Sequence, residues 1–479
     1  MPGVGAERLA HLLDAARGVD EWIATETRVR QVVQETGGRR SRSARETATL
    51  GAVVFRDSDQ GRGTARLWLD AGSGDEGRVR ALIASAVERA GLAVGPAWVL
   101  PAPAAPARVV VADPDVAVDP GTAVDSALAQ LGKAHGRLAS VARARIDAES
   151  RSHRAVTSRG FASAFESTSI GFDVDVGVLS GSGTVLEACR GRVRSVRQLF
   201  LHRRVADAAR TIARRMQVRS VEPGRYDLLL RPAAIAGPLA ELDPTAAGPA
   251  GFGWLAPLVA HAGGEWLRLG LSRHRPGQPV FRPGPYSGPT SSAPEGPRAA
   301  RLDPRRPPAG GEEPGGVFDE GDRLTLVSDG TLDLAPLSAP FAELGEPVRR
   351  FDIVRAGIAA GLALDHREAA LARTTPNGGV RNLVLAAGPT PATGLAGPGQ
   401  HRLLEIDQLG WLDVDPRTGA LTAEVRLGQV GATAVAGCLV IGNAFDLLAR
   451  AHLSSETATL GWYRGPAAIR IDGVDVAAV

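Results

Sequence analysis

Short segments in which apolar and polar residues alternate, separated by turn residues, fill most of the second half of the chain. They cover residues 322–337, 380–388, 403–431, 438–448 and 467–476. A period of two places successive side chains on opposite faces, as in the strands of half-buried antiparallel sheets. Helical patterns lie mainly outside these segments, so strands and helices are segregated along the chain. The pattern therefore predicts the α+β class, with N-terminal α/β blocks before a large antiparallel, β-rich C-terminal domain.

The first half divides at a linker rich in proline and alanine, residues 100–107. Before it, spacing predicts helices at 5–17 and 77–92 and a β-hairpin formed by 45–57 and 62–70. After it, we expect a strand at 108–113, a helix within 123–148, antiparallel strands at 152–160, 162–179 and 184–195, and a helix at 204–218. The expected domains are an N-terminal α/β subdomain at 1–99, a middle α+β subdomain at 108–222 and the β-rich domain at 225–479.

A proline-rich insertion interrupts the β-rich domain. Residues 275–316 hold eleven of the chain's 33 prolines, together with many glycines. Proline removes the backbone donor that helices and inner strands need, so no regular element persists there. We expect a long, mobile loop at 275–316.

The charge balance excludes a strongly basic nucleic-acid-binding protein. The chain carries 55 basic and 52 acidic residues, a formal net charge of +3. The one short basic run, Arg39 to Arg42, could contact nucleic acid, but a solvated loop is the preferred interpretation. No stripe of interleaved aromatic and basic residues supports nucleic-acid binding.

Targeting and redox features are sparse. Cys189 and Cys438 are the only cysteines, so neither a disulfide framework nor a zinc knuckle is predicted. The N-terminus lacks a basic region followed by an apolar one, so no signal peptide is predicted. The most apolar window, 430–449, is broken by Gly437, Gly442, Asn443 and Asp446 and indicates buried elements, not a membrane span. We expect a cytoplasmic protein that does not bind membranes.

The stretch 228–248 has the pattern of a strand that leads into a helix, with Glu241 near the helix end. Metallopeptidases place zinc sites in such positions, yet no histidine lies between His202 and His261. Other candidates are weaker. His261 and Glu265 could share a helical face as metal ligands, but Gly263 and Gly264 weaken a helix there.

We expect structural roles for the remaining candidate residues. His366, beside Asp365, and His452 are single histidines in helical patterns, expected at the surface or in satisfied core positions. Asp319 and Glu320 are adjacent on an expected strand and would point to opposite faces, which prevents joint acid–base action. No Gly-x-Ser-x-Gly motif for a serine nucleophile is present.

Four stretches together resemble the TldD/PmbA family, once labelled gyrase modulators and associated with zinc-dependent peptide cleavage. "FDEGDRLTLVSDGTL" (318–332) resembles the family's Asp-Glu-Gly signature, and "AVTSRG" (155–160) resembles a turn in its second block. "RTGALTAEV" (417–425) and "VIGNAFDLL" (440–448) resemble the Thr-Gly turn and the Gly-Asn segment that follows it. The order and spacing agree over most of the chain.

The resemblance implies one of two kinds of subunit. The TldD kind carries His-Glu-x-x-x-His after a strand like "YDLLL", and a cysteine from a C-terminal loop completes its zinc site. Counted from Leu228, the two histidine positions fall on Ala240 and Thr245, and the acid falls on Glu241. The C-terminal loop "TATLGWYRGPA" has no cysteine. The chain therefore resembles the TldE (PmbA) kind, which pairs with a zinc-bearing TldD subunit.

The expectations for function follow from this resemblance. We expect no catalytic, cofactor-binding or metal-binding residue on this chain, with Glu241 structural and zinc held by a TldD-like partner in a heterodimer. The pair would cleave extended or unfolded peptides, either in general proteolysis or in trimming a leader or conjugate. An alternative is a stand-alone escort that binds a peptide or biosynthetic intermediate without catalysis, using the 275–316 insertion for a partner contact.

Overall fold

The computed structural model describes residues 5–38, 40–70, 75–92, 94–133, 140–180, 183–242, 244–281 and 321–478. It divides the chain into two compact units. Unit 1 holds Met1–Met216, Asp329–Arg350 and Leu364–Asn382; unit 2 holds Gln217–Ser328, Phe351–Ala363 and Leu383–Val479. Most of the expected loop at 275–316, and both Asp319 and Glu320, lie outside the described residues. No helix among the described residues is both long and apolar enough to cross a membrane.

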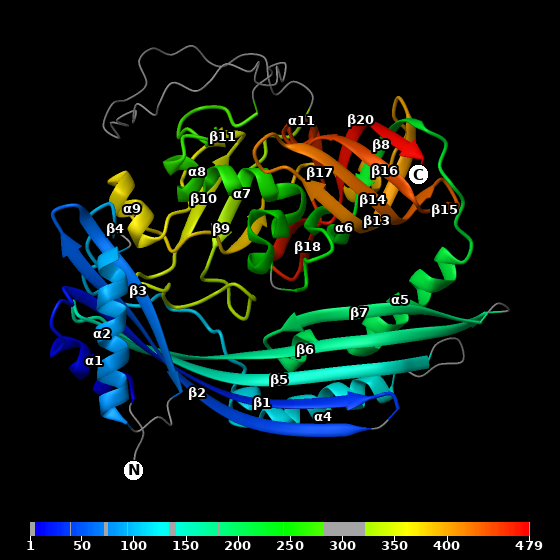
Figure 1. Cartoon of the computed structure of the whole chain (residues 1–479). Coiled ribbons are helices and arrows are strands. Elements are labelled where there is room, and N and C mark those ends of the chain that lie inside the picture. The colour runs from blue at the N-terminus through cyan, green and yellow to red at the C-terminus, as the bar shows by residue number, and fades with distance from the viewer. Residues whose placement is uncertain are drawn as a thin grey trace. The chain divides into compact units, whose positions relative to one another are not determined.

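Unit 1 is built on one antiparallel sheet of seven strands (Figure 1). Its order is β4-β3-β2-β1-β5-β6-β7. The strands are β1 (Glu21–Thr36), β2 (Ser41–Ser58), β3 (Gly61–Asp70), β4 (Val94–Gly95), β5 (Ser140–Thr157), β6 (Ala162–Ser180) and β7 (Gly183–Val193). The expected segments 1–99 and 108–222 both contribute strands to it.

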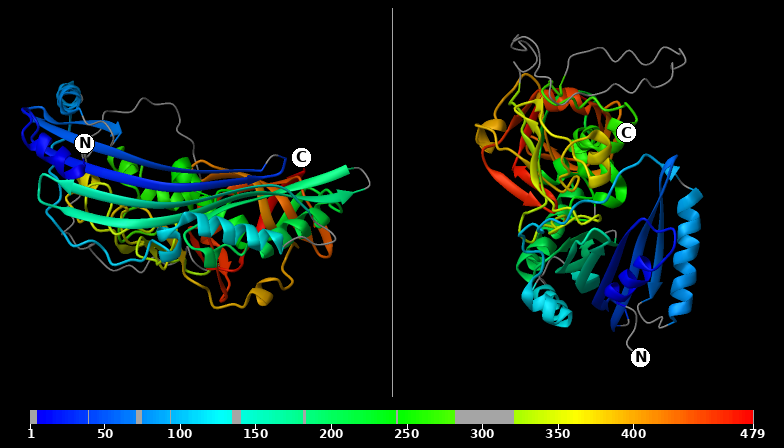
Figure 2. Two further views of the ribbon diagram at one scale, coloured as in Figure 1. Left: turned by 90° about the horizontal axis from the view of Figure 1, so that it is seen from below. Right: turned by 90° about the vertical axis from the view of Figure 1, so that its left-hand side faces the viewer.

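Helices cover one face of this sheet because one alternate set of its residues is apolar (Figure 2). On β2 these residues are Leu50, Ala52 and Val54, which pack with residues of two of the helices. The other helices pack on Ala144 and Ile146 of β5 and their neighbours. The five helices are α1 (Ala6–Asp14), α2 (Glu76–Leu92), α3 (Pro114–Val118), α4 (Pro120–Gly132) and α5 (Leu201–Arg215); a short 3-10 helix, η1 (Val196–Gln198), precedes α5.

A half-buried arginine holds part of the discontinuous chain within unit 1. The Arg194 guanidinium donates hydrogen bonds to the carbonyls of Val111, Pro336 and Ser338, at 2.8–2.9 Å. Burial lowers the pKa of Arg194 to about 10. The segment Leu364–Asn382 of this unit contributes helix α9 (His366–Ala372).

Unit 2 contains two further sheets. In the first, β11-β10-β9-β12-β19-β18, the strands are β9 (Leu326–Asp329), β10 (Arg350–Arg355), β11 (Ile358–Ala359), β12 (Asn382–Leu385), β18 (Thr457–Leu460) and β19 (Tyr463–Pro466). The second has the order β13-β8-β20-β16-β14-β15, and β13 also pairs with β14, which closes a ring of strands. It contains β8 (Gly224–Leu230), β13 (Arg402–Val414), β14 (Ala420–Val430), β15 (Thr433–Val435), β16 (Cys438–Asn443), β17 (Ala451–Leu453) and β20 (Ile469–Ala478).

The helices of unit 2 are short. They are α6 (Pro232–Ala236), η2 (Pro244–Leu255), α7 (Ala256–Ala262), α8 (Gly264–Arg268), α10 (Ala392–Leu395) and α11 (Ala444–Ala449). The long strands and short helices, segregated along the sequence, confirm the predicted α+β class.

A buried ion pair lies in the second sheet of unit 2. Asp227 on β8 is fully buried, and its Oδ2 accepts a hydrogen bond from Arg470 Nη2 on β20 at 2.9 Å. The Asp227 carboxylate also accepts the N–H groups of His401 and Gly473. Arg470 donates further to the carbonyls of Leu395 and Gly397. The pair therefore fastens residues 395–401 to two central strands.

Four local expectations were wrong. Residues 140–148 form the start of β5, not a helix, because Ala144, Ile146 and Ala148 are buried at a period of two. Residues 108–113 form no strand, since the Val110 N–H donates to the Asp333 carboxylate and the Val111 carbonyl accepts from Arg194. Ser41 and Arg42 begin β2 and are not part of a loop. His452 likewise lies in strand β17, not in a helix.

Removal of the buried pair should destabilise the protein much more than removal of an exposed pair on the same two strands. We expect Asp227→Asn to cost about 3 kcal/mol of unfolding free energy, because the buried Arg470 loses its buried counter-charge and keeps only the half-exposed Asp472. Urea unfolding followed by tryptophan fluorescence measures the loss.

The matched control is Asp475→Asn. Asp475 on β20 pairs with Arg225 on β8 at 3.3 Å, with both side chains mainly exposed. Its loss should cost less than about 0.5 kcal/mol. Gly399→Ala should act like Asp227→Asn, because a Cβ there would overlap both charged groups. Equal effects of the buried and exposed variants would contradict this account.

Candidate functional site

The stretch that the sequence singled out begins at the end of a fully buried strand. Leu228, Leu229 and Leu230 of β8 lie between parallel β13 and antiparallel β20. Pro232 occupies the start of α6, where its missing N–H costs nothing. The helix ends after Ala236, and Gly237 takes a positive φ of 78°. Glu241 therefore lies in a turn beyond the helix.

This turn packs directly against the C-terminal loop that follows β18. Gly461, with a φ of 54°, lies so close to the Ala240 carbonyl that a Cβ at Gly461 would overlap it. The Glu241 Cα would lie only 3.1 Å from such a Cβ. The helix α6 also contacts β18 and β19 on either side of the loop. The fold thus brings together the two segments that the family resemblance relates to zinc binding.

The described residues of these segments offer too few ligands for zinc. Ala240 is buried and ends in a methyl group, Thr245 is exposed, and Gly461 has no side chain. Zinc in proteins takes imidazole, thiolate and carboxylate ligands, and among the described residues of the turn and the loop Glu241 alone supplies one of these. Glu241 is half-buried and interacts with other groups of the chain. Within the described residues, no group of three or more His, Cys, Asp and Glu side chains could hold a metal ion.

His261 and Glu265 lie on two separate helices. The helix α7 ends at Ala262, and extended backbone at Gly263 precedes α8. His261 is buried against the rings of Trp266 and Phe445, at 5.1 and 5.5 Å between centroids. Its Nδ1 accepts the backbone N–H of Arg273 at 3.0 Å, so the neutral ring carries its proton on Nε2. His261 is therefore a core residue, and Glu265 is exposed.

His274 was missed by sequence reasoning because no motif surrounds it. It is buried, and neither ring nitrogen makes a hydrogen bond with a described residue. The buried Ser272 links it to His261: the Ser272 hydroxyl donates to the His261 carbonyl and accepts the His274 N–H. Burial lowers the pKa of both His261 and His274 to about 4. Both rings are thus neutral at pH 7.

The other singled-out residues have structural environments. Asp365 caps helix α9 by accepting the Glu368 N–H at 2.7 Å, and His366 Nε2 lies 2.9 Å from the Val99 carbonyl. Cys438 is buried, which raises its pKa to about 11 and keeps it a neutral thiol. A neutral buried thiol is neither a ready nucleophile nor a metal ligand.

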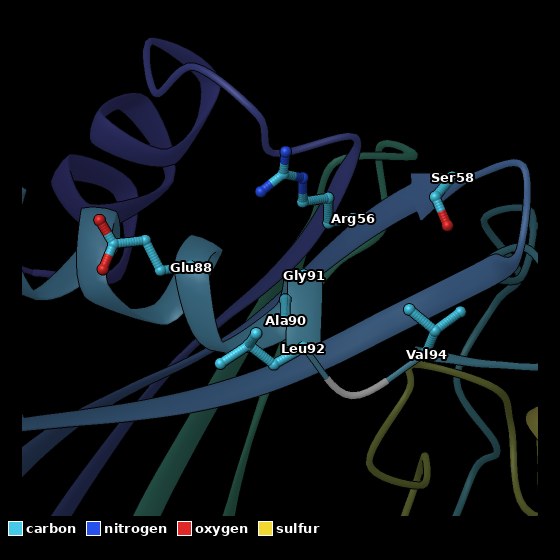
Figure 3. A pocket seen from close by; sticks show the side chains of 7 residues that line it. All are labelled: Arg56, Ser58, Glu88, Ala90, Gly91, Leu92 and Val94. Carbon is cyan, nitrogen blue, oxygen red and sulfur yellow. The ribbon is translucent and has the colours of Figure 1, made fainter.

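A shallow hollow of about 400 Å³ lies at the C-terminal end of α2 (Figure 3). Arg56 and Ser58 of β2 line it together with Glu88 of α2, beside a strip formed by Ala90, Gly91, Leu92 and Val94. Leu92 is 87% exposed. The hollow holds one base, one acid and one hydroxyl, without a histidine or a thiol. It offers no recognisable catalytic constellation.

The buried histidines should make stability fall as the pH falls from about 6.5 towards 4. In that range the unfolded chain binds protons at its histidines, with pKa near 6.5, while folded His261 and His274 remain neutral. Above pH 6.5 the two histidines make their full contribution to the free energy of unfolding. Each ring can account for roughly 3 kcal/mol of it at most. Urea unfolding at pH 7 and pH 4.5 measures the dependence.

His261→Asn keeps an acceptor for the Arg273 N–H but does not titrate, so it should flatten the pH dependence. His11→Asn, which replaces an exposed histidine of α1, is the control and should leave the dependence unchanged. If His261→Asn loses stability equally at both pH values, the ring is not a neutral buried base.

Comparison with known proteins relates both the sequence and the fold to one family. Residues 320–478 match the family model of the PmbA/TldA metallopeptidase C-terminal domain. The chain shares its fold with TldE from Thermococcus kodakarensis (TM-score 0.68, 18% identity, covering 98% of this chain and 99% of that one). The sequence matches none of the curated proteins with which it was compared.

Two further solved structures share this fold, both described as candidate modulators of DNA gyrase. One is from Bacteroides thetaiotaomicron (TM-score 0.72, 14% identity, covering 99% and 98%) and one is from Thermotoga maritima (TM-score 0.70, 13% identity, covering 98% and 99%). These identities show a common fold along the whole chain. The C-terminal match relates residues 320–478 to the TldD/PmbA family, and the whole chain shares the fold of these structures.

Proposed function

We propose that this chain is the non-catalytic, TldE-like subunit of a heterodimeric zinc metallopeptidase. One observation carries the proposal: the Ala240–Glu241 turn and the Gly461 loop are packed together, but Glu241 is the one residue of these three whose side chain could bind zinc. A degenerate or unfolded segment would leave these residues apart. The contact is instead close and depends on glycine at position 461. The backbone packing that would support a zinc site is thus present, but the side chains that would bind the metal are missing.

The chemistry must then come from a partner. A TldD-like subunit would hold the zinc, whose bound water attacks the peptide bond. This chain would contribute binding surface for extended or unfolded peptides, whose main chain can pair with exposed strands. The likeness to a structure named TldE supports this assignment of roles.

Native mass spectrometry of the chain purified from its own host, in buffers that retain zinc, tests the pairing. We expect a complex of about twice the 49.7 kDa mass of this chain, carrying one zinc ion. On dissociation in the gas phase the metal should follow the partner, since the described residues of this chain offer no set of ligands. Zinc that stays with this chain would overturn the proposal, and His261 would then be the first residue to replace.

Glu241→Ala tests the acid directly. A structural Glu241 predicts that peptide cleavage by the reconstituted complex changes by less than about twofold, whereas loss of a catalytic base costs about 10²- to 10⁴-fold. Cleavage rates are compared at matched thermal stability of the two complexes. The positive control replaces the glutamate of the partner's own zinc motif. A chelator-sensitive activity of this chain alone that Glu241→Ala abolishes would refute the proposed role.

A further inference from the structure

The outer edge of strand β2 is open over its first eight residues. Strand β3 pairs with β2 only from Thr49, which faces Asp70, to Ser58. On its other side β2 pairs with β1 along almost its full length, from Ser41 to Phe55. Residues 41–48 therefore have a neighbouring strand on one side only among the described residues. Residues 41–47 are all exposed.

This edge lacks several of the features with which proteins protect edge strands, although it carries the charged residues Arg42, Arg45 and Glu46. Natural edges are protected by charged side chains, above all lysine, by proline, by bulges or by short length, because an open strand pairs readily with another chain. Residues 41–48 contain neither proline nor lysine, and the β1–β2 register runs without a shift. Most of their side chains are small: Ser41, Ser43, Ala44, Thr47 and Ala48. A second strand can approach such an edge closely.

A hollow adjoins the open edge on the sheet face opposite the helices. Three cross-strand pairs form the floor of this hollow: Gln31 with Arg45, Val33 with Ser43, and Glu35 with Ser41. The hollow measures about 320 Å³, and the small Ser41 and Ser43 side chains account for its depth. It is wide enough for one side chain of a strand laid along the edge.

The charges beside the edge favour a guest that is uncharged or acidic. Arg40, Arg45 and Glu46 are exposed and form no ion pair with a described residue, which leaves two cations against one acid. The Arg42 guanidinium is already bound to Asp125 of α4 at 2.6 Å, and Arg145 in the hollow is bound to Glu35 at 2.6 Å. Arg45 forms no ion pair with any described residue. It is the cation in the hollow that remains available to a guest carboxylate.

We propose that residues 41–48 of β2 accept an extended, uncharged or acidic peptide as an added strand, in line with β3. Main-chain hydrogen bonds to the edge supply the affinity, and the hollow beside Arg45 receives one side chain. The inference deepens the proposed function and rests on it for the choice of occupant, a peptide on its way to the partner's zinc. The edge could guide about eight residues, roughly 27 Å of extended chain.

Backbone methylation of the guest provides the sharpest test, because it leaves the protein unchanged. The probe is a fluorescent peptide of about eight residues, the length of the edge, with alternating Thr and Val and one Asp. In an added antiparallel strand only every second N–H faces the host. Two isomers carry N-methyl groups on one or the other alternate set of residues. Anisotropy with the full-length chain, without any zinc subunit, measures the dissociation constants.

We expect one isomer to bind within about twofold of the unmethylated peptide and the other at least about tenfold more weakly, since it loses several hydrogen bonds. Equal binding of the two isomers would overturn strand addition, and so would failure of the unmethylated peptide to bind. A dimer of this chain that excludes the peptide would also overturn the proposal, because a second copy of the chain would then occupy the edge.

Two substitutions locate the site. Ser43→Trp fills the hollow and should weaken binding about tenfold or more, while Ser152→Trp, at an exposed serine of inner strand β5, should not. Arg45→Gln should weaken the Asp peptide but not its Asn counterpart. Equal effects of Ser43→Trp and Ser152→Trp would place binding elsewhere.

The proposed function and this inference can fail separately. If the chain pairs with a zinc subunit and supports cleavage but does not discriminate the isomers, the strand-addition proposal is wrong and the subunit role stands. If the isomers are discriminated but no zinc subunit is found, the edge binds peptides in a protein of another role.

Discussion

The Asp227–Arg470 ion pair is the interaction on which the arrangement of unit 2 depends. Buried ion pairs are costly unless every charged atom is hydrogen-bonded. Here both Asp227 oxygens accept hydrogen bonds, and the Arg470 nitrogens donate to Asp227, to Asp472 and to two carbonyls of residues 395–397. The pair therefore fixes β8 against β20 and fastens a loop beside them. Because β8 is fixed, the turn that follows it has a defined place against the Gly461 loop.

The scaffold of a site and its chemistry are separable in this fold. The Ala240 carbonyl and the Cα of Gly461 meet through backbone atoms, so their packing needs no metal. Loss of imidazole and thiolate ligands would therefore leave the local fold intact. This agrees with the general rule that function lies in side chains grafted onto a fold. A family can thus keep one architecture in two kinds of subunit and place the metal in only one of them.

The sequence predicted those features that depend on local periodicity. The hairpin β2–β3, the strands β13, β14 and β20, and the helices α1, α2 and α5 lie where alternation or helical spacing placed them, with ends shifted by a few residues. Residues 140–148 were missed although their period is two, because a helix was extended through them. The strand predicted at 108–113 was wrong for a different reason. An apolar run does not show that its backbone is hydrogen-bonded to the side chains of Asp333 and Arg194.

Features that depend on distant partners could not be predicted. The burial of His274 depends on segments remote in sequence. The need for glycine at position 461 arises only because the Ala240 carbonyl lies against it in the fold. Likewise, no property of residues 41–48 alone discloses an open edge. That edge exists because β2 is 18 residues long and β3 only 10.

The charges of the unit 1 sheet explain why main-chain pairing is the mode of recognition to expect at its edge. On the face opposite the helices, Arg192 pairs with Asp147, Arg190 with Asp173 and Arg151 with Glu149, at 2.8–3.1 Å. Neutralised pairs produce little long-range field, which nucleic-acid binding would require. On the outer side of residues 41–48, backbone amides and carbonyls have no partner strand among the described residues. Such groups can pair with the main chain of an extended peptide, which is the mode of binding that we propose for this edge.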